Sequence, residues 1–436
     1  MTGTSNTEVP QTPLKLIPLG GLGEIGLNMM AIEYGDSIIV VDCGLMFPED
    51  YMLGIDIVIP DVTYLKKNLD KVKALFVTHG HEDHTGAIPF VIRDVNVPIY
   101  ATALTIGLIE EKLDEFDLLG SVQFETVRPR DTVTVGPFSV EFIRVSHSIV
   151  DGCALAITTP AVVVIHTGDF KMDQTPVDGE VMDYARFSEY GERGVLALMS
   201  DSTNVEKEGY TLSEREVGVN LDEIFRRCAG RIIVAVFSSN IHRIQQVMDV
   251  AEKHGRKVVL NGKSMVANVS IARTLGYLRA SDGLILDLKE LDTVPAQRVV
   301  LLTTGSQGEP MSALTRMAMD NHKQIKVEKG DTVILSSKFI PGHEKAITTM
   351  MNHLYRRGAD VIYEKVSEVH VSGHAAQEEL KIMLNIVRPR FFMPVHGEYR
   401  HLVLHARLAQ KVGIPAANVV IAEDGTWSRS PRAVSV

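Results

Sequence analysis

The first part of the chain alternates short apolar runs with turn residues. Apolar runs of about four to eight residues, bounded by Gly, Pro, Asn or Asp, are typical of β-strands. Such runs, rich in Val, Ile and Leu, occupy residues 14–19, 37–44, 74–79, 139–147, 161–170 and 195–202. The clearest helical pattern in this part covers residues 103–116. We therefore predict a strand-rich region with few helices over the first ~200 residues.

From about residue 213 the pattern changes to a regular alternation of strands and helices. Strands are predicted at residues 231–237, 256–262, 298–305 and 331–337. Each leads into a helical stretch, the first of which starts at about residue 240. Repeated strand–helix units of this kind form a parallel sheet with helices on both faces.

After about residue 365 the pattern of the first part returns. The segment FFMPVHGEY (391–399) is predicted to contain a strand, and a helix follows to about residue 411. We interpret this order as a domain inserted into another domain. The predicted parts are a disordered leader (1–13), a first domain (14–212) resumed later (366–425), an inserted domain (213–365) and a tail (426–436).

A glycine-rich segment near the start imitates a dinucleotide-binding motif. Gly21, Gly23 and Gly26 have the GxGxxG spacing, and Asp42 lies about 20 residues beyond them. That motif needs a helix that opens at the third glycine, but only about eight residues precede the turn at Gly35, which is too few for a crossover. We therefore predict a glycine-rich turn between antiparallel strands.

The composition is that of an ordinary globular protein, with 45% hydrophobic and 23% charged residues among 436. No apolar run approaches the roughly 18–20 residues that span a bilayer, and the polar leader lacks the apolar core of a signal peptide. Three cysteines, an odd number, favour a reducing compartment. We therefore expect a cytoplasmic protein without a membrane partner.

The net charge of −11 bears on the partner. Nucleic-acid binding usually depends on a basic surface, so this charge argues mildly against a nucleic-acid partner. Bound divalent cations or a locally basic groove can override the global charge, because the local field decides binding.

Residues that bind metals follow several of the predicted strands. In VTHGHEDHTGAIP (77–89), His79, His81, Asp83 and His84 lie within six residues, and Gly80 lets the backbone bend. Imidazole and carboxylate are the ligand types of open, catalytic zinc sites. A solvated His-rich loop is the alternative. It is disfavoured because further candidates stand at other strand ends, namely Asp42, His147, Asp169, Asp201 and His396.

Three strand–loop–helix junctions are rich in Ser, Asn and Gly: FSSNIHRIQQ (237–246), TTGSQGEPMSAL (303–314) and HVSGHAAQEEL (370–380). Helix N-termini bind phosphate through free N–H groups and the helix dipole. Simple N-capping explains any one junction better, since Ser and Asn cap helices everywhere. Three junctions together, with His374 where capping does not require it, favour anion recognition.

These motifs carry a resemblance to a known family. Asp42, His79–His84, His147 and Asp169 resemble motifs one to four of the metallo-β-lactamase superfamily, and SDSTN, VSGHA and PVHGE resemble motifs of its β-CASP nucleases. From about residue 14 to 425 the chain is similar to the ribonuclease J family, including GGLGEIGLNMM and VVDCGLMFPE. The resemblance implies an α/β fold, a metallo-β-lactamase αββα sandwich with an inserted β-CASP domain that contains a parallel sheet.

The resemblance also implies a site with two Zn²⁺ ions, which Mn²⁺ or Mg²⁺ can replace. Its ligands would be His79, His81 and His147 for one ion, Asp83, His84 and His396 for the other, and Asp169 for both. Asp42 would fix a ligand imidazole from behind. His374 would be the general acid with Asp201 as its acidic partner, and Asp83 would also take part in catalysis.

The implied substrate is RNA, preferably with a 5′-monophosphate, and single-stranded DNA is a further candidate. The residues that would cradle phosphate are Ser239, Asn240, Ile241, His370, Val371, Ser372, Gly373 and His374. Lys263, Lys338 and Arg243 are expected to line the channel, whereas His242 and His343 are left without a role. A homodimer is a further expectation, although the C-terminal domain that supports dimers in bacterial relatives is expected to be absent.

Three functions compete at this point. The first is a zinc-dependent ribonuclease with 5′-to-3′ exonucleolytic and endonucleolytic action. The second keeps two zinc ions but hydrolyses a small ester, thioester or β-lactam, and the inserted domain with phosphate-suited loops speaks against it. The third, an RNA-binding scaffold without catalysis, is disfavoured by the complete ligand set.

Overall fold

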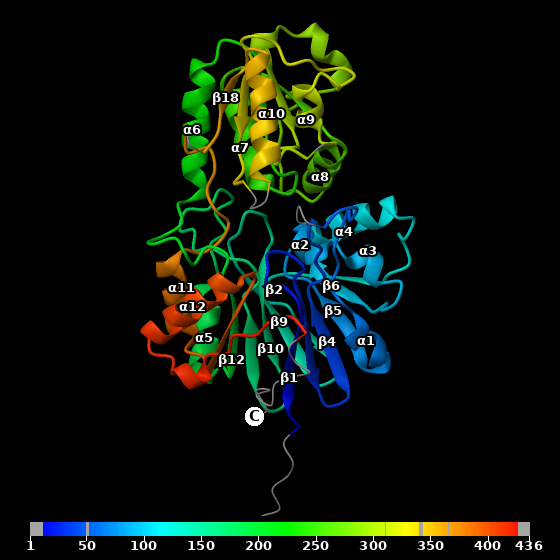
Figure 1. The fold of residues 1–436 in the computed structure, drawn as a ribbon, viewed down its shortest axis with the longest axis vertical. Helices are drawn as coiled ribbons and strands as arrows, with labels where there is room; N and C mark the ends of the chain where they lie inside the picture. The colour runs from blue at the N-terminus through cyan, green and yellow to red at the C-terminus, as the bar shows by residue number, and fades with distance from the viewer. Residues whose placement is uncertain (1–11, 49–51, 310, 340–342, 365, 426–436) are drawn as a thin grey trace, which may run out of the picture.

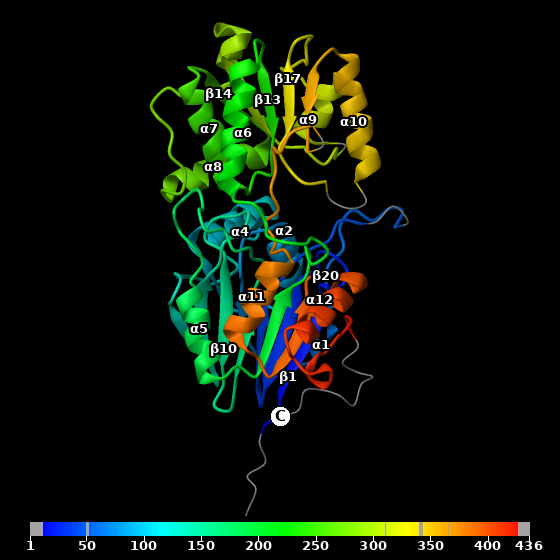
Figure 2. The same ribbon diagram turned by 90° about the vertical axis from the view of Figure 1, so that its left-hand side faces the viewer.

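The structure is a computed structural model that describes residues 12–48, 52–309, 311–339, 343–364 and 366–425. Two lobes follow one another along the long axis of the molecule, as two perpendicular views show (Figures 1 and 2). The predicted tail and the predicted leader up to residue 11 lie outside the described residues. Among the described residues, no helix has the length and apolar character that crossing a bilayer requires.

The larger lobe contains two six-stranded sheets. The first sheet has the order β1 (Leu14–Gly20), β3 (Met29–Tyr34), β4 (Ser37–Val41), β5 (Val72–Phe76), β6 (Ile99–Thr102) and β7 (Phe124–Val127). The second has the order β19 (Phe391–Val395), β12 (Ala197–Asp201), β11 (Val163–His166), β10 (Cys153–Thr158), β9 (Phe138–Arg144) and β8 (Thr132–Val135). Strand β19 comes from the far end of the sequence, so the chain returns to this lobe as predicted.

The two sheets face each other and enclose an apolar core. Along β5, Ala74 and Phe76 point into this core, where Phe76 meets Phe142 of the second sheet, while Leu75 points outward. Burying one large apolar side chain stabilises the fold by about 1.5–3 kcal/mol. The outer faces are covered by helices, α1 (Thr63–Lys67), α3 (Ile88–Val91) and α4 (Ala103–Glu115) on the first sheet, and α5 (Tyr184–Arg193), α11 (Gln377–Val387) and α12 (Tyr399–Lys411) on the second. The predicted αββα sandwich is confirmed.

The smaller lobe is built on one parallel sheet. Its order is β15 (Ile285–Leu286), β14 (Lys257–Asn261), β16 (Val299–Thr303), β13 (Ile232–Ala235), β17 (Thr332–Leu335) and β18 (Asp360–Ile362). One face carries α6 (Glu214–Arg227), α7 (Ile241–Lys253) and α8 (Lys263–Thr274), and the other carries α9 (Ala313–Ala318) and α10 (Glu344–Arg356). In β13, Ile232 and Val234 pack on the first group of helices and Ile233 on the second, so the strand is buried on both faces. The predicted inserted α/β domain is confirmed, whereas its limits at 213 and 365 stay a prediction.

The glycine-rich segment forms a turn between the antiparallel strands β1 and β3, and no helix opens at Gly26. Gly21, Gly23 and Gly26 have φ values of 87°, 94° and 104°, which favour glycine. Within the turn, β2 (Leu22–Gly23) pairs with β20 (Gly397–Glu398), and the N–H of His396 donates to the carbonyl of Gly21 over 3.1 Å. The turn therefore fixes the end of β19.

The directions of the strands bring the candidate residues to one edge. Strands β4, β5 and β6 are parallel in the first sheet, and β11, β12 and β19 are parallel in the second. Carboxyl ends of parallel strands meet at the same edge of a sheet. Helix α2 (Glu82–Thr85), which follows β5, lies at the edge of the larger lobe that faces the smaller lobe (Figure 1). The candidate residues at the strand ends therefore lie at the edge of the larger lobe that faces the smaller lobe.

The last described segment runs back to the glycine turn. The N–H of Val420 donates to Phe392 over 2.8 Å, and the N–H of Leu22 donates to Asp424 Oδ2 over 3.3 Å. Burial, together with a hydrogen bond to Glu24 and the charge of Glu24, raises the pKa of the Asp424 carboxyl to about 8.

This raised pKa predicts a pH dependence of stability. The unfolded chain releases the Asp424 proton near pH 4, so between about pH 4 and 8 the folded state binds more protons, and stability is lost as the pH rises through this window. We expect Asp424→Asn to melt at a higher temperature than the parent at pH 8.5, with a stability gain of about 1 kcal/mol or more, and the difference to shrink at pH 5.5. Thermal denaturation at both pH values measures it. A difference that does not change with pH would contradict this assignment.

Candidate metal centre

The predicted ligands come together at the shared edge in two groups. In each group the ligand atoms lie within 4.8 Å of one another. One group contains His79, His81, His147 and Asp169, and the other contains Asp83, His84, Asp169 and His396. The seven residues that the sequence suggested as ligands are thus all present, and Asp169 belongs to both groups.

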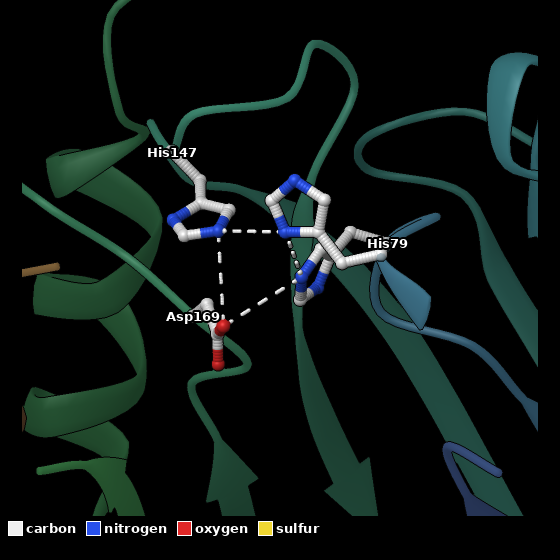
Figure 3. Close-up of side chains that lie close together, drawn as sticks. His79, His147 and Asp169 are labelled. Atoms are coloured by element: carbon white, nitrogen blue, oxygen red, sulfur yellow. Dashed lines mark hydrogen bonds and ion pairs between the residues drawn. The ribbon is translucent and has the colours of Figure 1, made fainter. Parts of the chain in front are cut away.

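In the first group three imidazoles and one carboxylate surround a common centre (Figure 3). His81 Nδ1 lies 3.2 Å from His79 Nε2 and 3.1 Å from His147 Nε2. Asp169 Oδ2 lies 3.6 Å from His79 Nε2 and 3.7 Å from His147 Nε2. Ligands at about 2.0–2.1 Å from a tetrahedral zinc ion are roughly 3.4 Å apart, so these separations fit one ion.

The second group has similar spacing but more carboxylate. His84 Nε2 lies 3.3 Å from Asp169 Oδ2 and 3.7 Å from Asp83 Oδ2. His396 Nε2 lies 3.1 Å from Asp83 Oδ2 and 3.6 Å from Asp169 Oδ2. Two carboxylates and two imidazoles are a suitable donor set for a divalent cation.

Asp169 provides a test of whether these residues fit a metal pair. Its side chain is 3% exposed, and Oδ1 has no hydrogen-bond partner among the described residues. A buried carboxylate oxygen without a partner is costly unless a charge or hydrogen bond satisfies it. The other oxygen, Oδ2, lies against imidazoles of both groups, where bound cations would offset the charge of the buried carboxylate. The cluster therefore fits metal ions.

Three candidate ligand rings are oriented by a hydrogen bond to Nδ1, the ring nitrogen that faces away from the proposed metal position. His84 Nδ1 donates to Asp42 Oδ2 over 2.8 Å, which leaves Nε2 with its lone pair toward the site. His147 Nδ1 donates to the carbonyl of Gly373 over 2.7 Å. His79 Nδ1 pairs with Thr78 Oγ1 over 3.0 Å, and Thr78 in turn donates to Asp42. Such partners fix the tautomer and direction of a ligand ring. The hydrogen bond from His84 to Asp42 supports the predicted role of Asp42, which stays a prediction.

The backbone is adapted to this crowding. Asp42 and His396 have φ values of 59° and 54°, a left-handed conformation that costs a non-glycine residue about 1–2 kcal/mol. Gly168 has φ 56°, and a Cβ there would lie 3.0 Å from Thr78 Cβ. Gly80 has no positive φ. A Cβ there would lie 2.7 Å from Leu108 Cδ1, so Gly80 contributes to close packing at this point, and its φ does not show the bend expected from the sequence.

The two groups differ in their electrostatics. Burial lowers the pKa of His79 and His147 well below the usual range and that of His81 to about 4. Burial also opposes a charge on His84 and His396, but the nearby carboxylates, Asp169 foremost, outweigh it and raise both pKa values well above the usual range. The second group therefore carries excess negative charge, which suits a bound cation.

His374 and Asp201 form a pair beside the cluster. His374 Nδ1 donates to Asp201 Oδ2 over 2.8 Å, and it lies 3.9 Å from Asp169 Oδ2. Burial favours the neutral form of Asp201, but His374 and then His396 outweigh it and lower the pKa of the Asp201 carboxyl well below its usual range. The Asp201 carboxylate thus holds one nitrogen of His374 and leaves the other, Nε2, free of this pair.

The phosphate-binding candidates occupy two places. His370, Ser372 and His374 lie in the connection before α11, where Ser372 Oγ accepts from the N–H of His374 over 3.1 Å. Gly373 of this connection packs against His147, since a Cβ on Gly373 would lie 2.7 Å from His147 Cε1. Val371, in the same connection, has its side chain in the apolar core of the smaller lobe.

The other candidates lie at the start of α7. Asn240 caps this helix, because its side chain accepts from the N–H of Arg243 over 3.0 Å. Ile241 is buried in the core of the smaller lobe, and its N–H donates to Ser239 O. Capping therefore accounts for the side chain of Asn240, and a phosphate role for Ser239, Asn240 and Ile241 stays a prediction.

The expected channel lysines and arginine have different surroundings. Arg243 is 0% exposed and bound to Glu214, so the expectation that it lines the channel is wrong. Its position on the buried face of α7 follows from helical spacing, because Val247, four residues further along the helix, is buried as well. Lys263 is exposed and pairs with Glu115 of α4 over 2.8 Å. Lys338 is exposed, close enough to affect His370 and His401 electrostatically.

Sequence reasoning missed three polar residues of the centre. Thr78 bridges Asp42 and His79, Thr203 Oγ1 pairs with His396 Nδ1, and Asn28 Nδ2 lies 3.2 Å from His84 Nε2. Thr78 and Thr203 stand inside or beside motifs that the sequence singled out, so their position was a usable signal. Asn28 follows the glycine turn, and no spacing rule connects it to His84.

Three family descriptions match successive parts of the chain. Residues 22–192 match the metallo-beta-lactamase superfamily, residues 229–354 match "Ribonuclease J, beta-CASP domain", and residues 358–420 match "Zn-dependent metallo-hydrolase RNA specificity domain". The first range lies in the larger lobe, the second in the smaller lobe, and the third covers mainly the segment that returns to the larger lobe.

Several curated proteins are similar over most of the chain. Ribonuclease J of Synechocystis is 49% identical, with 94% of this chain and 65% of that protein covered. Ribonuclease J of Thermus thermophilus is 46% identical, with 97% and 75% covered, and ribonuclease J2 of Bacillus subtilis is 42% identical, with 94% and 74% covered. The chain spans 65% of the length of the Synechocystis protein and 60% of that of a Helicobacter pylori ribonuclease J.

A solved structure shares the fold. A protein of unknown function from Enterococcus faecalis superposes with a TM-score of 0.69 at 17% identity, covering 94% of this chain and 98% of that one.

The contact between Asp42 and His84 predicts a selective loss of metal. We expect Asp42→Asn to weaken binding at the second group by about 10–100-fold, because the ring of His84 loses its anionic partner. Metal content after dialysis against a graded series of chelators measures the loss. Glu82→Gln is the matched control, since Glu82 lies in the same loop but pairs outward with Lys112. Equal retention of metal by Asp42→Asn and the parent would contradict the role of Asp42.

Proposed function

This chain belongs to the ribonuclease J family, and we propose that it is a metal-dependent ribonuclease that acts in RNA processing and decay. It would hydrolyse phosphodiester bonds from the 5′ end and also internally. The observation that carries the proposal is the His374–Asp201 pair beside the two ligand groups, with His374 Nδ1 3.9 Å from the shared Asp169. A proton donor next to a dinuclear metal site is the arrangement that phosphodiester hydrolysis requires.

The ligand residues would hold two divalent ions, for which we propose zinc, with manganese or magnesium as substitutes. His79, His81 and His147 would bind one ion, Asp83, His84 and His396 the other, and Asp169 both. When bound, such an ion pair supplies Lewis acidity, which lowers the pKa of water and offsets charge on a phosphoryl group. Asp169 would link the two positions, because it belongs to both ligand groups, whereas Asp83 contacts His84 and His396 of the second group.

His374 would supply the proton for the leaving group. Water adds its oxygen to phosphorus, the bond from phosphorus to the 3′ oxygen breaks, and the 3′ oxygen takes a proton from His374 Nε2. The carboxylate of Asp201 would keep the ring oriented through the hydrogen bond to Nδ1. The products are a 5′-phosphate and a 3′-hydroxyl.

The connection His370–His374 would receive phosphate groups of the substrate. Nδ1 of His370 is buried and has no hydrogen-bond partner among the described residues, and the cationic side chain of Lys338 lies close to it. Those features suit an anionic group, and they support RNA with a 5′-monophosphate as the preferred substrate. Single-stranded DNA, which carries the same backbone phosphates, would be a secondary substrate.

Hydrolysis of a small ester, thioester or β-lactam is the alternative for such a metal centre. It explains the ligands but not the second lobe, which covers the edge of the sandwich where the ligands lie. It also leaves the His370–His374 connection without a use. Membership of the ribonuclease J family also favours the ribonuclease over the hydrolase of small substrates.

The proposal places the enzyme in the cytoplasm. Cys43, Cys153 and Cys228 are all free thiols, and two of them are buried in the larger lobe. Free buried thiols are stable in a reducing compartment, and RNA processing and decay take place there.

One comparison of variants tests the proposal. We expect metal-loaded parent protein to cut 5′-monophosphorylated RNA, and His374→Ala to retain its metal but to be slower by about 10²–10⁴-fold, since it loses the proton donor. His79→Ala should lose both activity and the metal of the first group. Product analysis by gel and metal content by mass spectrometry are the measurements.

The alternative function has its own signature in the same assay. Turnover of a β-lactam or thioester, with neither RNA nor single-stranded DNA cut, would refute the ribonuclease. Metal loss in His374→Ala would refute the separation of proton donor and ligands.

A further inference from the structure

The connection that contains His370 and His374 links the smaller lobe to the larger lobe. It belongs to the described residues 366–376, which lie between β18 and α11. A second connection, 202–213, joins β12 to α6, and the two run side by side on one flank of the molecule (Figure 1). Backbone hydrogen bonds tie the second connection to the first turn of α11, from Gln377 N to Lys207 O over 3.0 Å and from Glu378 N to Gly209 O over 3.0 Å.

Arg243 holds the first end of this connection. Its guanidinium is fully buried and donates from Nη1 to the carbonyl of Val369 over 2.7 Å, immediately before His370. The same Nη1 donates to Ser336 O over 3.2 Å and to Ser336 Oγ, and Ser336 Oγ also donates to Val369 O. Nε donates to Glu214 Oε1 over 2.8 Å. One side chain therefore joins α7, β17, α6 and the start of the phosphate-binding candidate.

Glu379 holds the other end. This buried carboxylate accepts from the N–H of Ala376 over 2.8 Å, of Thr211 over 2.7 Å and of Met172 over 2.7 Å. The hydroxyl of Thr211 donates to His374 O over 2.8 Å. Because Thr211 and Glu214 lie three residues apart, both ends are fixed where the second connection enters α6.

The fork of Arg243 is suited to positioning. A planar guanidinium can serve Glu214 on one side and Val369 and Ser336 on the other at fixed angles, whereas the single ammonium of a lysine cannot reach both. The contacts of Arg243 are with backbone carbonyls and buried side chains, so it has no free group for substrate.

We propose that Arg243 is a positioning residue that sets the place of the His370–His374 connection relative to the metal centre, and thereby the selection of RNA 5′ ends. This inference rests on the proposed ribonuclease function. Arg243 does not touch substrate. It acts through Val369, and a small displacement of the connection moves both the phosphate-binding candidates and the proton donor His374.

The smaller lobe contains a matched control. Arg231 is also buried, at 9% exposure, and pairs with Asp331 through Nη2 over 2.6 Å and Nε over 3.2 Å. This ion pair stands at the amino ends of β13 and β17, the end of the sheet opposite to α7's first residues and the His370–His374 connection. A substitution of Arg231 therefore removes a buried ion pair from the same lobe without affecting any contact of the His370–His374 connection.

The experiment compares Arg243→Lys, Ser336→Ala and Arg231→Lys with the parent, all as metal-loaded full chains. Each is given one RNA oligonucleotide with a 5′-monophosphate or with a 5′-hydroxyl, and kcat and KM are measured for both. Hydrogen exchange of the backbone over residues 369–376 and the melting temperature are measured in parallel. Ser336→Ala removes one of the two donors to Val369 O and keeps the test open if Arg243→Lys does not fold.

We expect the parent to prefer the phosphorylated RNA, and Arg243→Lys to lower that preference by about tenfold or more, since small misplacement of a binding group has large effects on rate. Ser336→Ala should lower it by a smaller factor. Both should exchange faster over 369–376 with metal content unchanged. Arg231→Lys should keep the preference and the exchange pattern of the parent, even if its melting temperature falls as much.

Several outcomes would overturn the inference. They are an unchanged preference in both Arg243→Lys and Ser336→Ala, an equal loss in Arg231→Lys, and a parent that cuts RNA without regard to its 5′ end. A parent that cuts no RNA would instead refute the proposed function, and it is distinguished from the other outcomes by the parent assay alone.

Discussion

The contacts of the Asp169 carboxylate with four imidazoles are the constraint on which the rest of the structure depends. Its Oδ2 lies 3.3–3.7 Å from His79, His84, His147 and His396, almost without solvent. Polar groups are held so close only where surrounding structure fixes them, since burial without partners is costly. The sandwich meets this demand by ending its parallel strands at one edge, so that rigid strand ends, and not long loops, carry the ligands.

The same constraint explains the departures from regular structure around the centre. Asp42 and His396 adopt left-handed backbone conformations, and Gly168 and Gly373 leave room where a Cβ would collide with Thr78 or His147. Strain of this kind persists where packing over-determines it. The regular sheets on either side, with their apolar core, supply that packing. The strained backbone of the site is therefore unfavourable by itself, and the packing of the larger lobe maintains it.

Much of this arrangement could be predicted from the sequence, because short runs of Val, Ile and Leu with candidate ligands at their ends leave a local pattern. The inserted lobe followed from strand–helix alternation, and the ligands followed from their clustering at strand ends. Arg243 could not be placed correctly, because its partners Glu214, Ser336 and Val369 are distant in sequence and only the fold brings them together. Asn240 was ambiguous for a different reason, since capping and phosphate binding use the same residue types.

The docking of the glycine turn on β20 has a consequence for the order in which the protein is made. Asp42 and His79–His84 leave the ribosome early, but His396, which Gly21 fixes through its carbonyl, is among the last residues of the described chain to be synthesised. A nascent chain therefore carries only part of the candidate ligand set until the segment that contains His396 has been synthesised. The topology makes completion of the centre depend on two segments that are made at well-separated times.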